Sequence, residues 1–272
     1  MEPARAAVTW SRQAPAGKAE LPPAAGFDSD VESRSTSAES CEGSLSDAAV
    51  AARGGCAIAG FAETVEVRPW EAGRFAVVGE VQEAPRNQGR VVQMRDSTDG
   101  AAVAVKEMPN SWVAENAAAF AAEHPLETER PWVDIECQAL LARARFPYVC
   151  KLRGVFVDGE ATRVVSDFAP GGDLFAWTVA EPTPPGPGRE HLVRPLVSQV
   201  ADAVRRLHDM SIVHGDISME NIVLAGGGPA GPQVRLVDFG NATSQRRLPC
   251  MAALGKEAYR APEACSREGE YD

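Results

Sequence analysis

Short apolar runs rich in valine begin at Phe75 and continue through the first half of the chain. Three of them, FAVVGEV, GRVVQM and AAVAVKEM, are separated by stretches typical of turns, of which DSTDG is the clearest. Short runs of β-branched residues between turn signals predict strands. We therefore expect an antiparallel meander in this region.

A helical pattern follows over Ile135–Leu141, and two more strand-like runs, KLRGVFV and TRVVSDF, come after it. The segment EPTPPGPG predicts a loop. Beyond this loop, apolar residues recur at spacings of four and three, which predicts one face of an amphipathic helix: Leu192, Leu196, Val200, Val204 and Leu207. A largely β half followed by a largely helical half predicts an α+β fold with two lobes.

The first 60 residues have a different character, because they are rich in Ala, Ser, Pro, Gly and Glu and lack a periodic apolar pattern. Such a segment cannot bury enough apolar surface to offset the entropy lost on ordering. We expect residues 1–60 to form a disordered tail and residues 70–272 to form one folded domain. Within that domain, the mostly β part would span about 70–168 and the helical part about 169–272.

The formal net charge of −11 argues against general binding to nucleic acid or to anionic membranes, since both are polyanions. The N-terminus lacks the apolar stretch of a signal peptide, and no later run approaches the roughly 18 apolar residues of a membrane span. We expect an intracellular, cytoplasmic protein. The six cysteines include no CxxC pair, so neither a disulfide framework nor a zinc site is expected.

Candidate chemistry is concentrated in HGDISMENIVL at 214–224, LVDFG at 236–240 and GKEAYRAPE at 255–263. An Asp, an Asn five residues later and a second Asp before Phe-Gly are the residue types that metal-assisted phosphoryl transfer requires. One carboxylate orients the attacking hydroxyl, while Asn and Asp oxygens suit Mg²⁺ held against ATP phosphates. The order and spacing of the three segments make a chance arrangement improbable.

These motifs resemble those of the eukaryotic protein kinase family, and the resemblance runs from about Phe75 to the end of the chain. It implies that Asp216 is the catalytic base, that Asn221 and Asp238 bind Mg²⁺, and that Lys106 of VAVK contacts the ATP phosphates. ATP and Mg²⁺ are the implied cofactors, and an unidentified protein is the implied acceptor. The segment GKEAYRAPE resembles the serine/threonine kinase form.

The same resemblance places the nucleotide. The run VVSDFAPGGDLF is similar to the hinge between the two lobes, which implies adenine contacts with the backbone of Asp167 and Ala169 and puts Ser166 at the position that guards the pocket. Ala104 would cover the adenine ring. Asp173 either contacts the ribose or caps a helix.

The expected partner of Lys106 is Glu136 in DIECQALL. Glu127 and Glu129 are nearby alternatives, and Glu136 could also be a carboxylate on a solvated helix face.

The glycine loop that covers the phosphates departs from the family pattern. Gly79 and Gly89 are too far apart for GxGxxG, and close backbone approach to phosphate needs small residues. Gly79, Gly89 and Val91 remain candidate nucleotide contacts, although we expect Gly89, Arg90 and Val91 to supply mainly the returning strand. Weaker binding of the phosphates follows from this departure.

A second departure concerns Ser218 and Lys256. The resemblance implies a lysine at the first position and a threonine at the second, so the two residue types are exchanged. We expect the hydroxyl and the ammonium to face one another near Asp216, and Lys256 is therefore a catalytic candidate. The alternative is that Lys256 points to solvent, as most lysines do.

Two other functions stay open. The altered glycine loop and Ser218 favour a pseudokinase scaffold that binds ATP without transferring phosphate, whereas retention of the Lys106, Asp216, Asn221 and Asp238 set opposes it. A small-molecule phosphotransferase, similar to aminoglycoside and choline kinases, is opposed by the APE triplet at 261–263. Because the chain ends soon after APE, we also expect the helical lobe to be incomplete.

Overall fold

The computed structural model describes residues 65–84, 88–228, 231–245, 248–249, 255–265 and 270–271. The tail expected over residues 1–60 lies outside the described residues. Within the described part of the chain, no helix combines the length and the apolar character needed to cross a membrane.

A six-stranded sheet forms the first half of the fold, with the strand order β1-β5-β6-β4-β3-β2. Its strands are β1 (Val67–Pro69), β2 (Phe75–Ala84), β3 (Gly89–Asp96), β4 (Ala102–Pro109), β5 (Leu152–Val157) and β6 (Ala161–Asp167). The antiparallel pairing of β2 with β3 and of β3 with β4 confirms the predicted meander. The parallel pairing of β1 with β5 was not expected, because three residues give no readable alternation.

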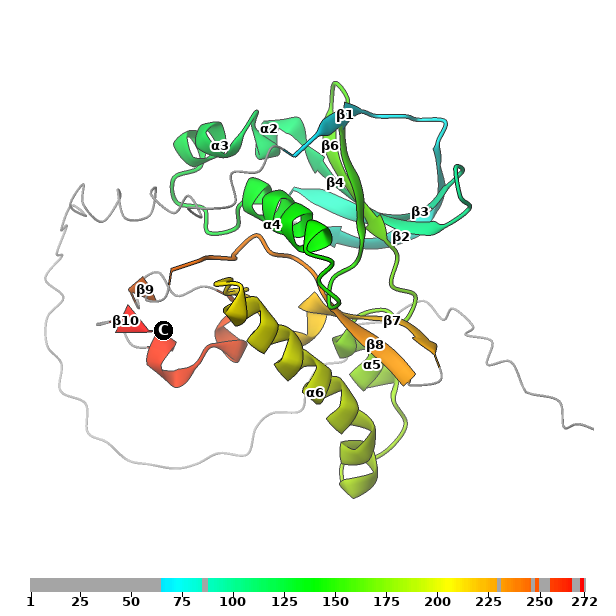
Figure 1. Ribbon diagram of the computed structural model, residues 1–272, viewed down its shortest axis with the longest axis vertical. Helices are drawn as coiled ribbons and strands as arrows, with labels where there is room; N and C mark the ends of the chain where they lie inside the picture. Colours follow the sequence, from blue (N-terminus) through cyan, green and yellow to red (C-terminus); the bar gives the residue numbers. More distant parts are fainter. Residues whose placement is uncertain are drawn as a thin grey trace, which may run out of the picture. The chain divides into compact units, whose positions relative to one another are not determined.

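Three helices come between β4 and β5. These are α2 (Asn110–Val113), α3 (Ala117–Glu123) and α4 (Pro131–Arg143). The helix predicted over Ile135–Leu141 is confirmed, and it begins earlier, at Pro131, whose ring fixes the backbone in a helical conformation where no N–H is needed. Figure 1 shows α4 beside the sheet, with α2 and α3 near its start.

Helix α4 is buried on several sides, which explains why its sequence lacks a clear polar face. Ile135 packs with Met108 and Val155 of the sheet. Leu141 belongs to a different cluster, which includes Leu207 of the helical half. A helix that is apolar around much of its circumference packs inside a protein. The side chains of α4 therefore reach the cores of both halves.

The second half begins with α5 (Leu174–Ala180) and the long α6 (Pro187–Asp209). A 3₁₀ turn (Met219–Asn221) leads into the hairpin of β7 (Ile222–Gly228) and β8 (Gly231–Leu236). Figure 1 shows this hairpin beside α6. Shorter pieces follow: the strand β9 (Leu248–Pro249), the 3₁₀ turns Glu257–Tyr259 and Pro262–Cys265, and the strand β10 (Glu270–Tyr271).

The predicted apolar face of α6 is confirmed in part. Leu196 and Leu207 are buried, and Val200 and Val204 are half-buried. Leu192 is 42% exposed, because it lies in the first turns of the helix, away from the core. The later turns of α6 therefore anchor the helical half.

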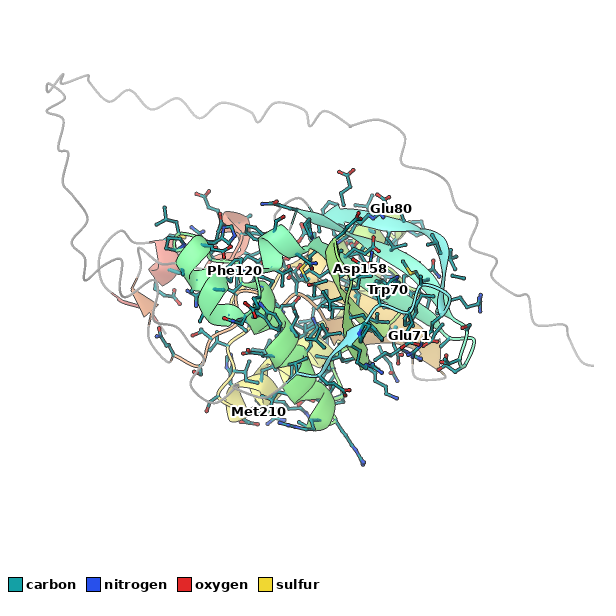
Figure 2. The ribbon with its side chains drawn as sticks, turned by 90° about the horizontal axis from the view of Figure 1, so that it is seen from above. Trp70, Glu71, Glu80, Phe120, Asp158 and Met210 are labelled. Carbon is teal, nitrogen blue, oxygen red and sulfur yellow. The ribbon has the colours of Figure 1, made fainter. Side chains whose placement is uncertain are left out.

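Aromatic side chains pack at two separate places around the sheet. Trp70 stacks on Phe75 with ring centroids 4.8 Å apart, and both contact Phe156. Phe120 of α3 packs against Trp112 of α2 at 5.3 Å. Figure 2 shows Trp70 and Phe120 well apart. The aromatic pair of α2 and α3 thus fixes these two helices independently of the cluster at Trp70.

Candidate functional site

A cavity of about 450 Å³ is lined by side chains from both halves of the fold. The sheet contributes residues of β2, β3, β4 and β6, and the helical half contributes the 3₁₀ turn, β7 and the residues around Asp238. Predicted site residues that line it are Val91, Ala104, Lys106, Asp167, Ala169, Asp173, Asn221, Asp238 and Lys256. Segments far apart in the sequence therefore meet at one place.

Two predicted nucleotide contacts do not reach this cavity. Gly79 pairs with Gln93 inside the β2–β3 ladder, and Gly89 lies at a different groove that holds none of the predicted catalytic residues. An added Cβ on Gly89 would overlap the carbonyl oxygen of Glu107 on β4. Gly89 thus permits close strand packing, and it does not line this cavity.

Bulkier residues of β2 take the place of glycine at the cavity. Val81, Gln82, Glu83 and Ala84 line it directly. The carboxylate of Glu83 adds negative charge where a polyanionic ligand would be covered. The change in the glycine pattern therefore alters the side chains that β2 presents to the cavity, as well as the spacing of the glycines.

The residues that the sequence assigned to adenine lie on the adjacent strands β4 and β6 and just beyond β6. Ala104 is directly opposite Ser166 in the ladder, and Asp167 follows at the end of β6. The backbone N–H of Asp167 donates to the carbonyl oxygen of Lys151, at 2.9 Å. Because this N–H is already bonded, the backbone group of Asp167 that remains for a ligand is its carbonyl oxygen.

Lys106 forms two ion pairs, and neither involves Glu136. Its Nζ lies 2.9 Å from Oδ2 of Asp134 and 3.2 Å from Oδ1 of Asp238. Burial alone would lower the pKa of Lys106, but the charges of Asp134 and Asp238 outweigh burial and raise it above 10.5. The predicted pairing with Glu136 is therefore wrong, and Asp134 takes its place.

The helical geometry of α4 explains this correction. Residues two positions apart are separated by about 200° around a helix, so Asp134 and Glu136 face different directions. Glu136 is half-buried, and burial raises its pKa. Asp134 and Gln138 are four residues apart on one face, and both line the cavity. Among the alternatives, Glu129 also lines the cavity and Glu127 does not.

Asp134 connects α4 to the segment that carries Asp238. Its Oδ1 accepts hydrogen bonds from Gln138 Nε2 at 2.7 Å and from the backbone N–H of Phe239 at 3.0 Å. A further backbone bond joins the N–H of Arg130 to the carbonyl oxygen of Gly240. The carboxylate is almost fully buried and thus fixes Lys106 and the Asp238 segment together.

Asp238 has a positive φ of 66°, an uncommon conformation for a residue other than glycine. Phe239, which follows, is fully buried against His214, with ring centroids 4.5 Å apart. The buried Phe239 and its bond to Asp134 hold the backbone so that the Asp238 carboxylate lines the cavity.

Asp216 lies just behind the cavity wall, with its side chain 2% exposed. Asn221 Nδ2 donates to Asp216 Oδ2 at 2.9 Å and to the Asp216 carbonyl oxygen at 2.8 Å. His214 is buried, and burial lowers its pKa. A neutral His214 accepts the Asp216 N–H at Nδ1 and donates from Nε2 to the Val237 carbonyl oxygen, so it orders the loop.

Ser218 and Lys256 are direct neighbours, as the sequence predicted. Lys256 Nζ donates to Ser218 Oγ at 2.7 Å and lies 3.5 Å from Asp216 Oδ2 and 3.9 Å from a Glu220 carboxylate oxygen. The backbone N–H of Lys256 donates to Asp216 Oδ1 at 3.0 Å. Lys256 therefore contacts the loop around Asp216 through both its backbone and its side chain.

Both readings of Asp173 are compatible with the structure. Its side chain accepts a hydrogen bond from the Ala176 N–H and caps the N-terminus of α5, and it also lines the cavity.

The donor set at the cavity fits Mg²⁺ bound together with phosphate. Asn221 and Asp238 both line it, and they offer hard oxygen ligands. Mg²⁺ usually takes only one or two protein ligands and completes its shell with phosphate oxygens and water. The described residues contain no group of three or more His, Cys, Asp or Glu side chains placed to hold a metal by themselves, and this mode of binding needs none.

Comparison with known proteins agrees with the geometry. Residues 87–272 match the protein kinase domain family. The chain is 30% identical to CBL-interacting protein kinase 29 of Oryza sativa subsp. japonica over 180 residues, which cover 66% of this chain and 38% of that protein. It is 30% identical to Aurora kinase of Dictyostelium discoideum over 150 residues, covering 55% and 35%. It is 35% identical to Serine/threonine-protein kinase D2 of Rattus norvegicus over 136 residues, covering 48% and 15%. The matches span 15% to 38% of the lengths of these relatives.

Proposed function

This chain belongs to the protein kinase family, and on that premise we propose that it transfers the γ-phosphoryl group of ATP to a serine or threonine hydroxyl of a protein. The observation that carries the proposal is the meeting of Lys106, Asn221 and Asp238 in one cavity, with Asp216 bonded to Asn221 behind its wall. Preference for serine or threonine is supported by the GKEAYRAPE segment and by the likeness to Serine/threonine-protein kinase D2.

The nucleotide would lie with adenine between Ala104 and the backbone of Asp167 and Ala169. Val91, which is opposite Lys106 in the ladder, would cover it from β3, and Asp173 would lie near the ribose. The ammonium of Lys106 would contact the α- and β-phosphates. Its ion pairs with Asp134 and Asp238 orient the lysine before the nucleotide arrives.

Asn221 and Asp238 would hold Mg²⁺, which neutralises charge on the phosphates when bound. Asp216 accepts the proton of the attacking hydroxyl. The hydroxyl oxygen forms a bond to the γ-phosphorus, the bond from that phosphorus to the bridging oxygen breaks, and its electron pair leaves with ADP. The contacts of Asn221 and His214 keep Asp216 in place for this step.

A second candidate function is a scaffold that binds ATP without transferring phosphate. It is favoured by Gly79 and Gly89 lying away from the cavity and by Glu83 lining it. Retention of the complete Lys106, Asp216, Asn221 and Asp238 set favours transfer.

Calorimetric titration tests the assignment of the nucleotide site. Wild type should bind ATP in the presence of Mg²⁺, and chelation of the metal or the substitution Lys106→Ala should each weaken binding at least about tenfold, because a phosphate contact is lost. Lys151→Ala is the matched control, since Lys151 is exposed and lies outside the cavity lining. Equal ATP affinity in wild type and Lys106→Ala would contradict the site assignment.

A further inference from the structure

The charges at the cavity are unevenly distributed. Among the described residues, the cations that line it are Lys106 and Lys256, and they face a larger set of acidic residues: Glu83, Glu129, Asp134, Asp167, Asp173, Glu220 and Asp238. Lys106 is held by Asp134 and Asp238. Lys256 instead contacts the loop around Asp216, through Asp216 and Ser218.

Position and chemistry both suit Lys256 for a role at the reacting group. Its Nζ is 3.5 Å from Asp216 Oδ2, so the ammonium lies beside the carboxylate that would receive the acceptor proton. Its closest contact is the neutral hydroxyl of Ser218, at 2.7 Å, and a carboxylate oxygen of Glu220 lies farther away, at 3.9 Å. A fixed cation stabilises the charge on a phosphoryl group in transfer wherever in the chain it originates.

The backbone explains how this lysine reaches the site. Gly255 has a φ of 78°, and a Cβ added there would lie 2.7 Å from the Gly215 carbonyl oxygen and 3.1 Å from Asp216 Oδ1. Only glycine allows this approach, and the approach places the Lys256 N–H on Asp216. The ammonium thus arrives with the segment 255–256 and not with the Asp216 loop itself.

We propose that Lys256 supplies the positive charge that stabilises the transferred phosphoryl group, so that docking of the segment 255–256 on Asp216 completes the catalytic site. This inference rests on the proposed function. Undocking the segment removes the cation from the site while leaving Lys106, Asn221 and Asp238 in place for nucleotide binding. The segment therefore controls transfer independently of ATP affinity.

The test compares two affinities measured by calorimetry: one for ADP with Mg²⁺, and one for the same mixture with aluminium fluoride, which imitates the phosphoryl group in transfer. Wild type should bind the second mixture more tightly, because enzymes bind analogues of the transition state more tightly than ground-state ligands. The increase in affinity on adding aluminium fluoride is called the gain. Lys256→Met, which keeps the stem and the backbone bond to Asp216, should reduce this gain about tenfold or more and leave the ADP affinity unchanged. Lys151→Met is the matched control and should change neither affinity.

Two further variants identify the charge as the cause. Adding Ser218→Lys to Lys256→Met returns an ammonium from the neighbouring position and should restore part of the gain. Gly255→Ala blocks docking and should reduce the gain as Lys256→Met does. In turnover assays, Lys256→Met should lower kcat about a hundredfold with little change in the KM for ATP.

An aluminium fluoride gain that is the same in wild type and Lys256→Met, including no gain in either, would overturn this inference while leaving the proposed nucleotide site intact. Failure of wild type to bind ADP with Mg²⁺ would overturn both proposals.

Discussion

At the scale of single residues, Asp134 is the side chain that organises the site. Its carboxylate accepts hydrogen bonds from Lys106, Gln138 and the Phe239 backbone, and it is almost completely buried. An aspartate is one methylene shorter than the glutamate that the sequence suggested at position 136, so α4 must lie close to Lys106 for the pair to form. The pair therefore depends on the placement of α4.

Asp134→Ala should lower the free energy of unfolding by about 3 kcal/mol, because it removes one partner of a buried ion pair. This cost is near the low end of the range for breaking a buried ion pair, because Asp238 still contacts Lys106 in the variant. ATP affinity should fall as well. Urea denaturation and calorimetric titration would measure the two effects.

Glu136→Ala is the matched control on the same helix and should cost less than about 1 kcal/mol. Among the described residues, the Glu136 side chain makes no hydrogen bond or ion pair. A larger effect of Glu136→Ala than of Asp134→Ala on both quantities would restore the pairing expected from the sequence.

Sequence reasoning worked at this scale where spacing along the chain is fixed by a motif. The Asp216, Asn221 and Asp238 set was recognisable because a short loop and a hairpin join its members, and the Ser218–Lys256 contact followed from two aligned motifs. The partner of Lys106 was not recognisable. It depends on the rotation of α4, and apolar residues on several sides of that helix leave its rotation undefined in the sequence.

At the scale of elements, the β2–β3 hairpin shows how the same residue type can serve packing instead of binding. Gly89 starts β3 where that strand passes the backbone of Glu107, and the neighbouring Arg90 bonds to the Glu107 carboxylate at 2.8 Å. The register between β2 and β3 shifts between Glu80 and Gln82, next to Val81–Ala84, which line the cavity. Glu80, labelled in Figure 2, lies on the same outer strand. The meander of β2, β3 and β4 was predictable from the apolar runs and the turns between them, whereas the bulges were not.

Gly89→Ala should destabilise the fold by about 1–3 kcal/mol, because the new Cβ would force β3 away from β4. Affinity for ADP with Mg²⁺ should stay close to wild type, since Gly89 does not line the cavity. Thermal unfolding and calorimetry would measure these quantities. Gly73→Ala is the control and should be neutral, since nothing lies within 4 Å of a Cβ added there. Loss of nucleotide affinity without loss of stability in Gly89→Ala would show instead that Gly89 contacts the ligand.

At the scale of the whole molecule, the site exists only because the sheet and the helical half meet. Lys106 comes from β4, Asp134 from α4, and Asp216, Asp238 and Lys256 from the helical half. Two features connect the halves: the buried side chains of α4, which pack in the cores of both, and the backbone hydrogen bond from Arg130 to Gly240. Motifs identified every one of these members except Asp134, and the fold explains how they come together.

The substitution Asp216→Asn tests the central claim most directly. It keeps the size of the side chain and removes the group that accepts the proton, so it should preserve affinity for ATP with Mg²⁺ and reduce transfer to a protein substrate by about a hundredfold or more. The control is Asp209→Asn at the exposed end of α6, which should change neither quantity. Transfer is measured from γ-labelled ATP and affinity by calorimetry. The account predicts intact binding with lost transfer. Transfer by Asp216→Asn at the wild-type rate, or binding of ATP by wild type with no transfer at all, would contradict it.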